Sequence, residues 1–158
     1  MRTRRIGALL PLLLLLAACV REEHPSLTAS DVTAYAALPG QPAGVAYFSL
    51  ENSTASAITL RQVTSPEFGR VEMHTTLVED GIARMMPLDS LTIAEHSGIA
   101  FVPGGPHLML MEPMNELGAG DVVTLELHFD SGDVHVADNE RRSDEGRFLA
   151  VRAPLRSR

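Results

Sequence analysis

The sequence predicts an all-β domain, either a β-sandwich or a Greek-key barrel, and three features support this fold class. Apolar and polar residues alternate over several short segments, as they do in strands that bury one face. Turn signals such as "LPGQPAG", "NSTAS", "PGGP" and "GAG" separate these segments at intervals of roughly ten residues. No long stretch has a convincing helical period. About seven or eight short strands at this spacing are typical of sandwiches and Greek-key barrels.

The first half of the domain offers four segments with strand character. Residues 31–37 fit a first strand or a short turn of helix. Residues 43–52, "AGVAYFSLEN", alternate clearly, and residues 57–65, "AITLRQVTS", fit a further strand. Residues 71–80, "VEMHTTLVED", run into Asp80-Gly81, a dipeptide that favours a two-residue type I′ hairpin turn.

The second half continues this pattern. Residues 91–95 fit a short strand, and residues 121–130 and 133–138 alternate with a period of two. The chain has no tryptophan and few aromatic residues, so the core must be built from Val, Leu, Ile, Ala and Met. Residues 31–138 are expected to form one domain.

The N-terminal residues 1–18 predict a cleaved secretory signal peptide. Three arginines precede an apolar run that is too short to span a bilayer comfortably, and small residues complete a cleavage site. The following "LAAC" resembles a bacterial lipobox, so we expect lipidation of Cys19 and anchoring to a membrane. This places the domain on the periplasmic side of a bacterial envelope, and Val20, in place of an aspartate, favours the outer membrane.

The charge of the chain excludes several functions. Removal of the signal peptide changes the formal charge from −7 to −10, and an acidic domain repels nucleic acid. All 13 basic residues are arginine, so Schiff-base and P-loop lysine chemistry are excluded. Residues 19–30 are expected to be a linker, and residues 139–158, with six arginines and three acidic residues, a loosely ordered basic tail.

A hairpin brings one histidine and one methionine together. In the register that the Asp80-Gly81 turn imposes, Met85 lies opposite Thr76, and His74 is its diagonal neighbour at roughly 7–8 Å between backbones. Met86 points to the other face, and a slip of one residue would reverse this choice. Methionine often fills gaps in cores, so packing is the alternative interpretation of Met85.

The segment "GPHLMLM" supplies a second pair, because His107 and Met109 share one face of an extended strand. If an edge of the sandwich brings the two pairs together, they provide two imidazoles and two thioethers. Soft, uncharged thioethers favour Cu(I) over Zn(II). The domain has no cysteine thiolate, which a type 1 electron-transfer copper site requires. The alternative interpretation is that the histidines lie on the surface and that the methionines, Met111 among them, pack in the core.

The spacing of these residues resembles that of the periplasmic copper chaperone family PCuAC, formerly DUF461. His74, ten residues, Met85, twenty-one residues and His107-x-Met109 match its pattern, and the likeness extends from about residue 31 to residue 138. The resemblance implies a cupredoxin-like β-sandwich that binds Cu(I) through these four residues. It also implies delivery of copper to the Cu(A) centre of cytochrome c oxidase, with an oxidase subunit or its assembly factor as partner. Thr75 and Thr76 depart from the family, in which a glutamate and a methionine commonly follow the first histidine.

No feature predicts an enzyme, because no serine lies in a nucleophile elbow and no glycine-rich loop leads into a helix. A lipid-anchored, monomeric Cu(I) chaperone is the first hypothesis. A copper buffer or resistance lipoprotein with the same site and no dedicated acceptor is the second. A structural lipoprotein that binds no metal is the third.

Overall fold

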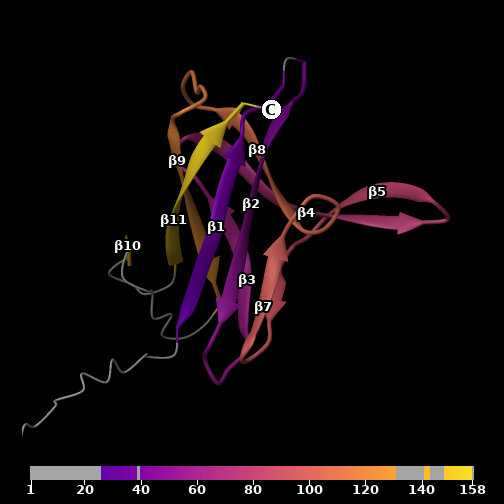
Figure 1. Ribbon diagram of the computed structural model, residues 1–158, viewed down its shortest axis with the longest axis vertical. Helices are drawn as coiled ribbons and strands as arrows, with labels where there is room; N and C mark the ends of the chain where they lie inside the picture. The colour runs from indigo at the N-terminus through magenta and orange to yellow at the C-terminus, as the bar shows by residue number, and fades with distance from the viewer. Residues whose placement is uncertain (1–25, 39, 131–140, 143–147, 158) are drawn as a thin grey trace, which may run out of the picture.

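The computed structural model describes residues 26–38, 40–130, 141–142 and 148–157, and every regular element within them is a strand (Figure 1). The predicted all-β fold class is therefore confirmed. The strands are β1 Leu27–Tyr35, β2 Ala43–Asn52, β3 Ile58–Thr64, β4 Phe68–Glu79, β5 Ile82–Pro87, β6 Leu91–Ile93, β7 Ser97–Phe101, β8 His107–Pro113, β9 Val122–Phe129, β10 Arg141–Arg142 and β11 Phe148–Arg156.

The strands form two sheets that join along one seam. The first sheet has the order β5-β4-β8-β2-β1, and β7 also pairs with β2. The second has the order β11-β9-β3-β6, and β10 also pairs with β11. A short parallel pairing of β1 with β11, Ala34 with Leu155 and Tyr35 with Arg156, connects them. All the other strand pairs described are antiparallel.

A single apolar core lies inside this sandwich. Alternate residues of β2 and of β9 are buried, because successive side chains of a strand point to opposite faces. Phe48 of β2 and Phe101 of β7 stack with ring centroids 4.2 Å apart. Leu and Val side chains from both sheets complete the core as expected, but the expectation of a core without aromatic residues is wrong, because Phe68 and Phe129 are buried in it as well.

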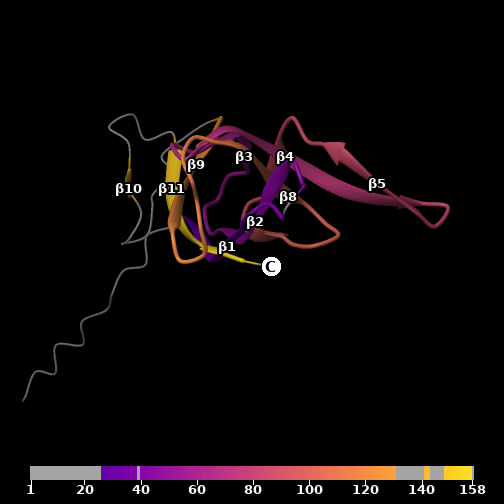
Figure 2. The same cartoon turned by 90° about the horizontal axis from the view of Figure 1, so that it is seen from above.

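The hairpin of β4 and β5 projects from the sandwich (Figures 1 and 2). β8 pairs with β4 only from Phe68 to His74, so the remainder of β4 has β5 as its partner. Positive φ angles at Asp80 (52°) and Gly81 (77°) fit the predicted type I′ turn. Every residue of β5 is exposed. This projecting hairpin of β4 and β5, which we call the arm, is thus attached to the rest of the sandwich along one side of β4.

Three further expectations from the sequence need correction. The first element is a strand that begins at Leu27, inside the expected linker. No strand was expected at residues 97–101, which form β7. The expectation of a loosely ordered tail is wrong for β11, because this strand pairs with β9 and buries alternate side chains.

Other expectations concern residues outside the described ranges. These are the signal peptide, Cys19, most of the expected linker and the expected strand at residues 133–138. In the described part of the chain, no helix has the length and apolar character needed to cross a membrane.

Candidate metal centre

Three neighbouring strands, β5, β4 and β8, carry the four candidate donors on one face. His74 of β4 lies directly opposite His107 of β8. Met109 lies two residues further along β8, opposite Glu72, and is therefore a diagonal neighbour of His74. Met85 of β5 is the other diagonal neighbour of His74. Opposite and alternate residues share a face, so His74 lies at the centre of the set.

The register of the hairpin is as the sequence predicts. Met85 pairs with Thr76 and Met86 with Thr75, so the two methionines point to opposite faces. The two halves meet at an edge of the sandwich, because β5 is the edge strand of the first sheet and β4 and β8 are the next two strands.

The two imidazole rings lie close enough for both to reach one ion. The centroids of His74 and His107 are 6.2 Å apart, with the ring planes inclined at 41°. Two metal–nitrogen bonds of about 2.0 Å each, with about 1.2 Å from nitrogen to ring centre on each side, span about 6 Å. This is the largest separation that two ligands of one ion allow, and it applies when the two nitrogens lie on opposite sides of the ion.

His107 is held with one nitrogen available for a ligand. Its side chain is 5% exposed, and its Nδ1 lies 2.9 Å from the carbonyl oxygen of Gly105. A carbonyl oxygen only accepts hydrogen bonds, so Nδ1–H donates and Nε2 carries the lone pair. Backbone carbonyls commonly orient metal-binding histidines in this way.

His74 has a buried nitrogen with no hydrogen-bond partner. Its Nε2 lies 2.9 Å from Oε2 of Glu72, and its Nδ1 is buried and unpaired. An unpaired buried polar atom costs free energy. A soft metal ion at Nδ1 would provide the missing partner, so the residues present fit such an ion.

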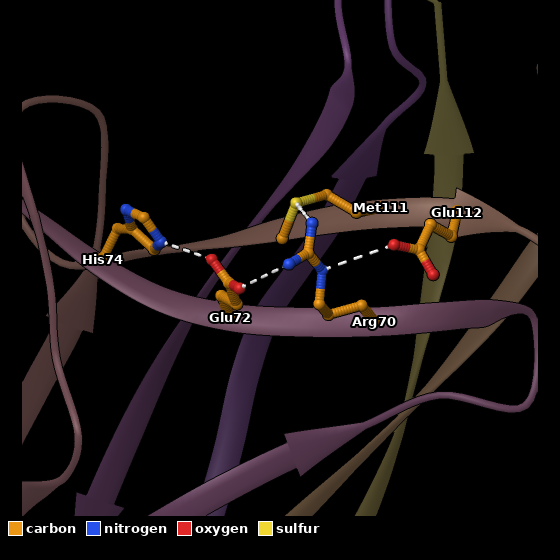
Figure 3. A network of polar contacts seen from close by, with 5 residues as sticks. All are labelled: Arg70, Glu72, His74, Met111 and Glu112. Carbon is orange, nitrogen blue, oxygen red and sulfur yellow. Dashed lines mark hydrogen bonds and ion pairs between the residues drawn. The ribbon is translucent and has the colours of Figure 1, made fainter.

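Charged residues extend along the same face (Figure 3). Oε1 of Glu72 lies 3.3 Å from a terminal nitrogen of Arg70, and Nε of Arg70 lies 3.6 Å from Glu112. The other terminal nitrogen of Arg70 donates a hydrogen bond of 3.4 Å to the sulfur of Met111. Glu72 was not singled out from the sequence, although its place two residues before His74 puts it on the same face.

The remaining methionines and histidines of the described residues are not among the four candidate donors. Met73 belongs to the core, Met111 is buried beside Arg70, and Met114 is exposed. His128 lies on β9 in the other sheet, where its Nε2 contacts the hydroxyl of Thr64 at 2.9 Å. His96 occupies a tight bend with φ 48°.

The arrangement offers two imidazoles and two thioethers. In the described part of the chain, no group of three or more His, Cys, Asp or Glu side chains could hold a metal ion. Thioethers select soft ions such as Cu(I), and imidazole binds copper as well. The donor set is uncharged when both histidines are neutral, which suits a monovalent ion.

Comparison with known proteins identifies relatives in sequence. The family model described as "Putative lipoprotein LpqE-like" matches residues 27–137. The uncharacterized protein RP573 of Rickettsia prowazekii (strain Madrid E) is 32% identical over 85 residues, which make up 53% of this chain. The aligned part covers 47% of RP573, so the chain spans about half the length of this relative.

Solved structures of PCuAC domains share the fold. The solution structure of the Cu(I) form of DR1885 from Deinococcus radiodurans is 25% identical, with a TM-score of 0.56, over 88% of this chain and 83% of that chain. The copper-bound PCuAC domain from PmoF2 is 18% identical, with a TM-score of 0.59, over 82% of this chain and 92% of that chain. The apo PCuAC domain from PmoF1 is 15% identical, with a TM-score of 0.61, over 86% of this chain and 98% of that chain. The predicted cupredoxin-like β-sandwich is therefore confirmed.

Proposed function

Because the chain belongs to the LpqE-like family, we propose that it is an envelope lipoprotein that binds one Cu(I) ion and transfers it to another protein. His74, Met85, His107 and Met109 are the proposed ligands. One observation carries the proposal. A cross-strand pair of histidines lies between two diagonal methionines, and one histidine nitrogen is buried without a partner.

The fold supports copper as the cargo. The solved structures that share this fold include a PCuAC domain with bound copper and the Cu(I) form of DR1885. The proposed donors of this chain are the soft and borderline ligands that Cu(I) prefers. The protein has no part in a chemical reaction under this proposal, because copper enters and leaves unchanged.

The exposure of the ligands suggests how copper would leave. His107 is almost fully buried, at 5% exposure, whereas Met85 is 53% exposed on the projecting arm. A ligand from a partner protein can approach the bound ion more readily from the side of Met85 than from the side of His107. The proposed transfer therefore begins with replacement of the Met85 thioether, and His107 releases the ion last.

The first experiment measures Cu(I) binding to a soluble form that starts after Cys19. Titration against a chelator of known affinity should give one equivalent of bound Cu(I). The double variant His107→Ala/Met109→Ala should lose this binding. The control is His96→Asn/Met114→Ala, which changes the same two residue types at exposed positions and should bind as the unaltered protein does. Equal binding by both double variants would exclude the site.

The acceptor is the finer part of the proposal. We propose delivery towards the Cu(A) centre of cytochrome c oxidase, as the family resemblance implies. Incubation of the Cu(I)-loaded protein with a purified, copper-free Cu(A) domain or assembly factor should transfer the ion. Retention of copper in the presence of these acceptors would favour the alternative, an envelope buffer or resistance lipoprotein that uses the same site.

The membrane anchor is a separate part of the proposal. The lipobox-like "LAAC" and the lipoprotein family both support lipidation of Cys19, on the periplasmic side of the envelope. Expression in a bacterium fed with a labelled fatty acid should label the protein. Cys19→Ser should abolish the label and release the protein from the membrane fraction.

A further inference from the structure

Glu72 links the candidate metal centre to a set of charges on the same sheet face (Figure 3). One carboxylate oxygen, Oε2, lies 2.9 Å from Nε2 of His74. The other, Oε1, lies 3.3 Å from the guanidinium of Arg70. Arg70 contacts Glu112 through a different nitrogen. The carboxylate of Glu72 is thus held on both sides.

This contact determines which nitrogen of His74 carries the proton. A carboxylate only accepts hydrogen bonds, so Nε2–H of His74 donates to Glu72. Nδ1 of the neutral ring then carries the lone pair, and Nδ1 is the buried atom that lacks a partner. In His107 the roles are reversed, because Nδ1–H donates to the carbonyl of Gly105. The two opposite histidines therefore present different nitrogens.

We propose that Glu72 is a positioning residue for copper: its contact with His74 makes that histidine bind through Nδ1, while His107 binds through Nε2. This inference rests on the proposed function. Arg70 restrains Glu72 from its far side and keeps the carboxylate directed at His74. Hydrogen bonds of this kind orient metal-binding imidazoles and make them better donors, and their loss typically weakens metal binding by roughly 10–100-fold.

The chain offers a matched control for Glu72. Glu112 also forms an ion pair with Arg70, but the structure gives it no contact with His74. Glu72→Gln and Glu112→Gln each remove one carboxylate from the same guanidinium. In Glu72→Gln, the side-chain amide can also donate to Nε2, so the constraint on the proton is lost. Both side chains are partly exposed, and both variants should fold.

The primary measurement needs no copper. Nitrogen NMR of the imidazoles in the apo protein should show His74 as a single Nε2–H tautomer and His107 as Nδ1–H. Glu72→Gln should shift His74 to a mixture of tautomers, and Glu112→Gln should leave it unchanged. Observation of Nδ1–H at His74 in the unaltered protein would overturn the proposal.

The second measurement uses Cu(I) itself, which is diamagnetic and compatible with NMR. Loading should move the Nδ1 resonance of His74 and the Nε2 resonance of His107. Chelator competition should show an affinity loss of roughly 10–100-fold for Glu72→Gln and less than about twofold for Glu112→Gln.

The outcomes separate this inference from the proposed function. Binding of copper through Nε2 of His74, or equal affinities in the two variants, would refute the role of Glu72 and leave the copper site intact. Failure of the unaltered protein to bind Cu(I) would refute the proposed function, and this inference with it.

Discussion

Two adjacent methionines of β5 differ in the face to which they point. Met85 shares the face of His74, and Met86 points to the other side of the arm. We therefore expect Met85→Leu to weaken Cu(I) binding by about tenfold or more, or about 1.4 kcal/mol, because the leucine has no donor atom. Met86→Leu should bind as the unaltered protein does. Chelator competition on the two variants checks this, and equal losses would mean that the register is not the one described.

At the same scale, one exposed ion pair should make a small contribution to stability that depends on pH. The hydrogen bond from Arg61 lowers the pKa of Asp130, and the guanidinium charge acts in the same direction. A lowered carboxyl pKa stabilises the folded state above the usual value of about 3.9. This contribution is lost as the pH falls through the lowered pKa.

The expected result is a slightly less stable Asp130→Asn variant at neutral pH. The denaturation midpoints of the two proteins should converge as the solution is acidified below the usual aspartate pKa. High salt should also reduce the difference at neutral pH, because both side chains are exposed. A difference that persists in strong acid would show that the ion pair is not its cause.

At the scale of elements, the β4–β5 arm depends on its turn. Gly81 has φ 77°, and a side chain added there would meet no atom within 4 Å. The cost of substitution is therefore the backbone strain of the left-handed region, about 1–2 kcal/mol. Gly81→Val should loosen the arm and weaken Cu(I) binding through Met85. Gly81→Asn should do so much less, since asparagine tolerates this conformation.

Amide hydrogen exchange along β5 checks this prediction. Exchange should become faster in Gly81→Val, whereas the core strands of the sandwich should keep their protection. Unchanged exchange in β5 would mean that the turn does not hold the arm.

The arm is also the part of the site that was most predictable from the sequence. A two-residue turn fixes the register of a hairpin, so Asp80-Gly81 is enough to select Met85 over Met86. The alternation in "HLMLM" places His107 and Met109 on one face by the same local argument. The pairing of β4 with β8 joins residues more than thirty positions apart, and no local signal specifies it. The role of Glu72 depends on that pairing and on side-chain contacts.

At the scale of the whole molecule, β11 closes the sandwich. It pairs with β9 along its length and with the end of β1. Three of its buried side chains are Leu149, Val151 and Leu155. Burial of each stabilises the fold by about 1.5–3 kcal/mol, and together they are comparable with the total stability of a domain, about 5–15 kcal/mol.

A chain that ends at residue 147 should therefore fail to fold. A chain that ends at residue 156 should keep the stability of the full sequence. Thermal unfolding followed by circular dichroism distinguishes the two. A cooperative transition in the shorter chain would show that β11 is dispensable.

The sequence contains a signal for β11 that the charge of the tail obscured. Its buried leucine, valine and alanine alternate with arginines and a proline, which is a period of two. Six arginines in the last twenty residues favoured a loosely ordered tail instead of a strand. The fold class was nevertheless predictable, because it follows from the alternation of many strands. The boundary of the domain depends on one strand whose partners lie far away in the sequence.

The free end of the arm offers a place for an optical probe. Cys19 is the only cysteine of the chain, so a protein that starts at Val20 has no other thiol for a dye to modify. Glu79→Cys would provide a single attachment point on an exposed residue beside the turn. A fluorophore there would lie away from the packed interior (Figure 2), and changes in its emission would follow the docking of an acceptor in real time.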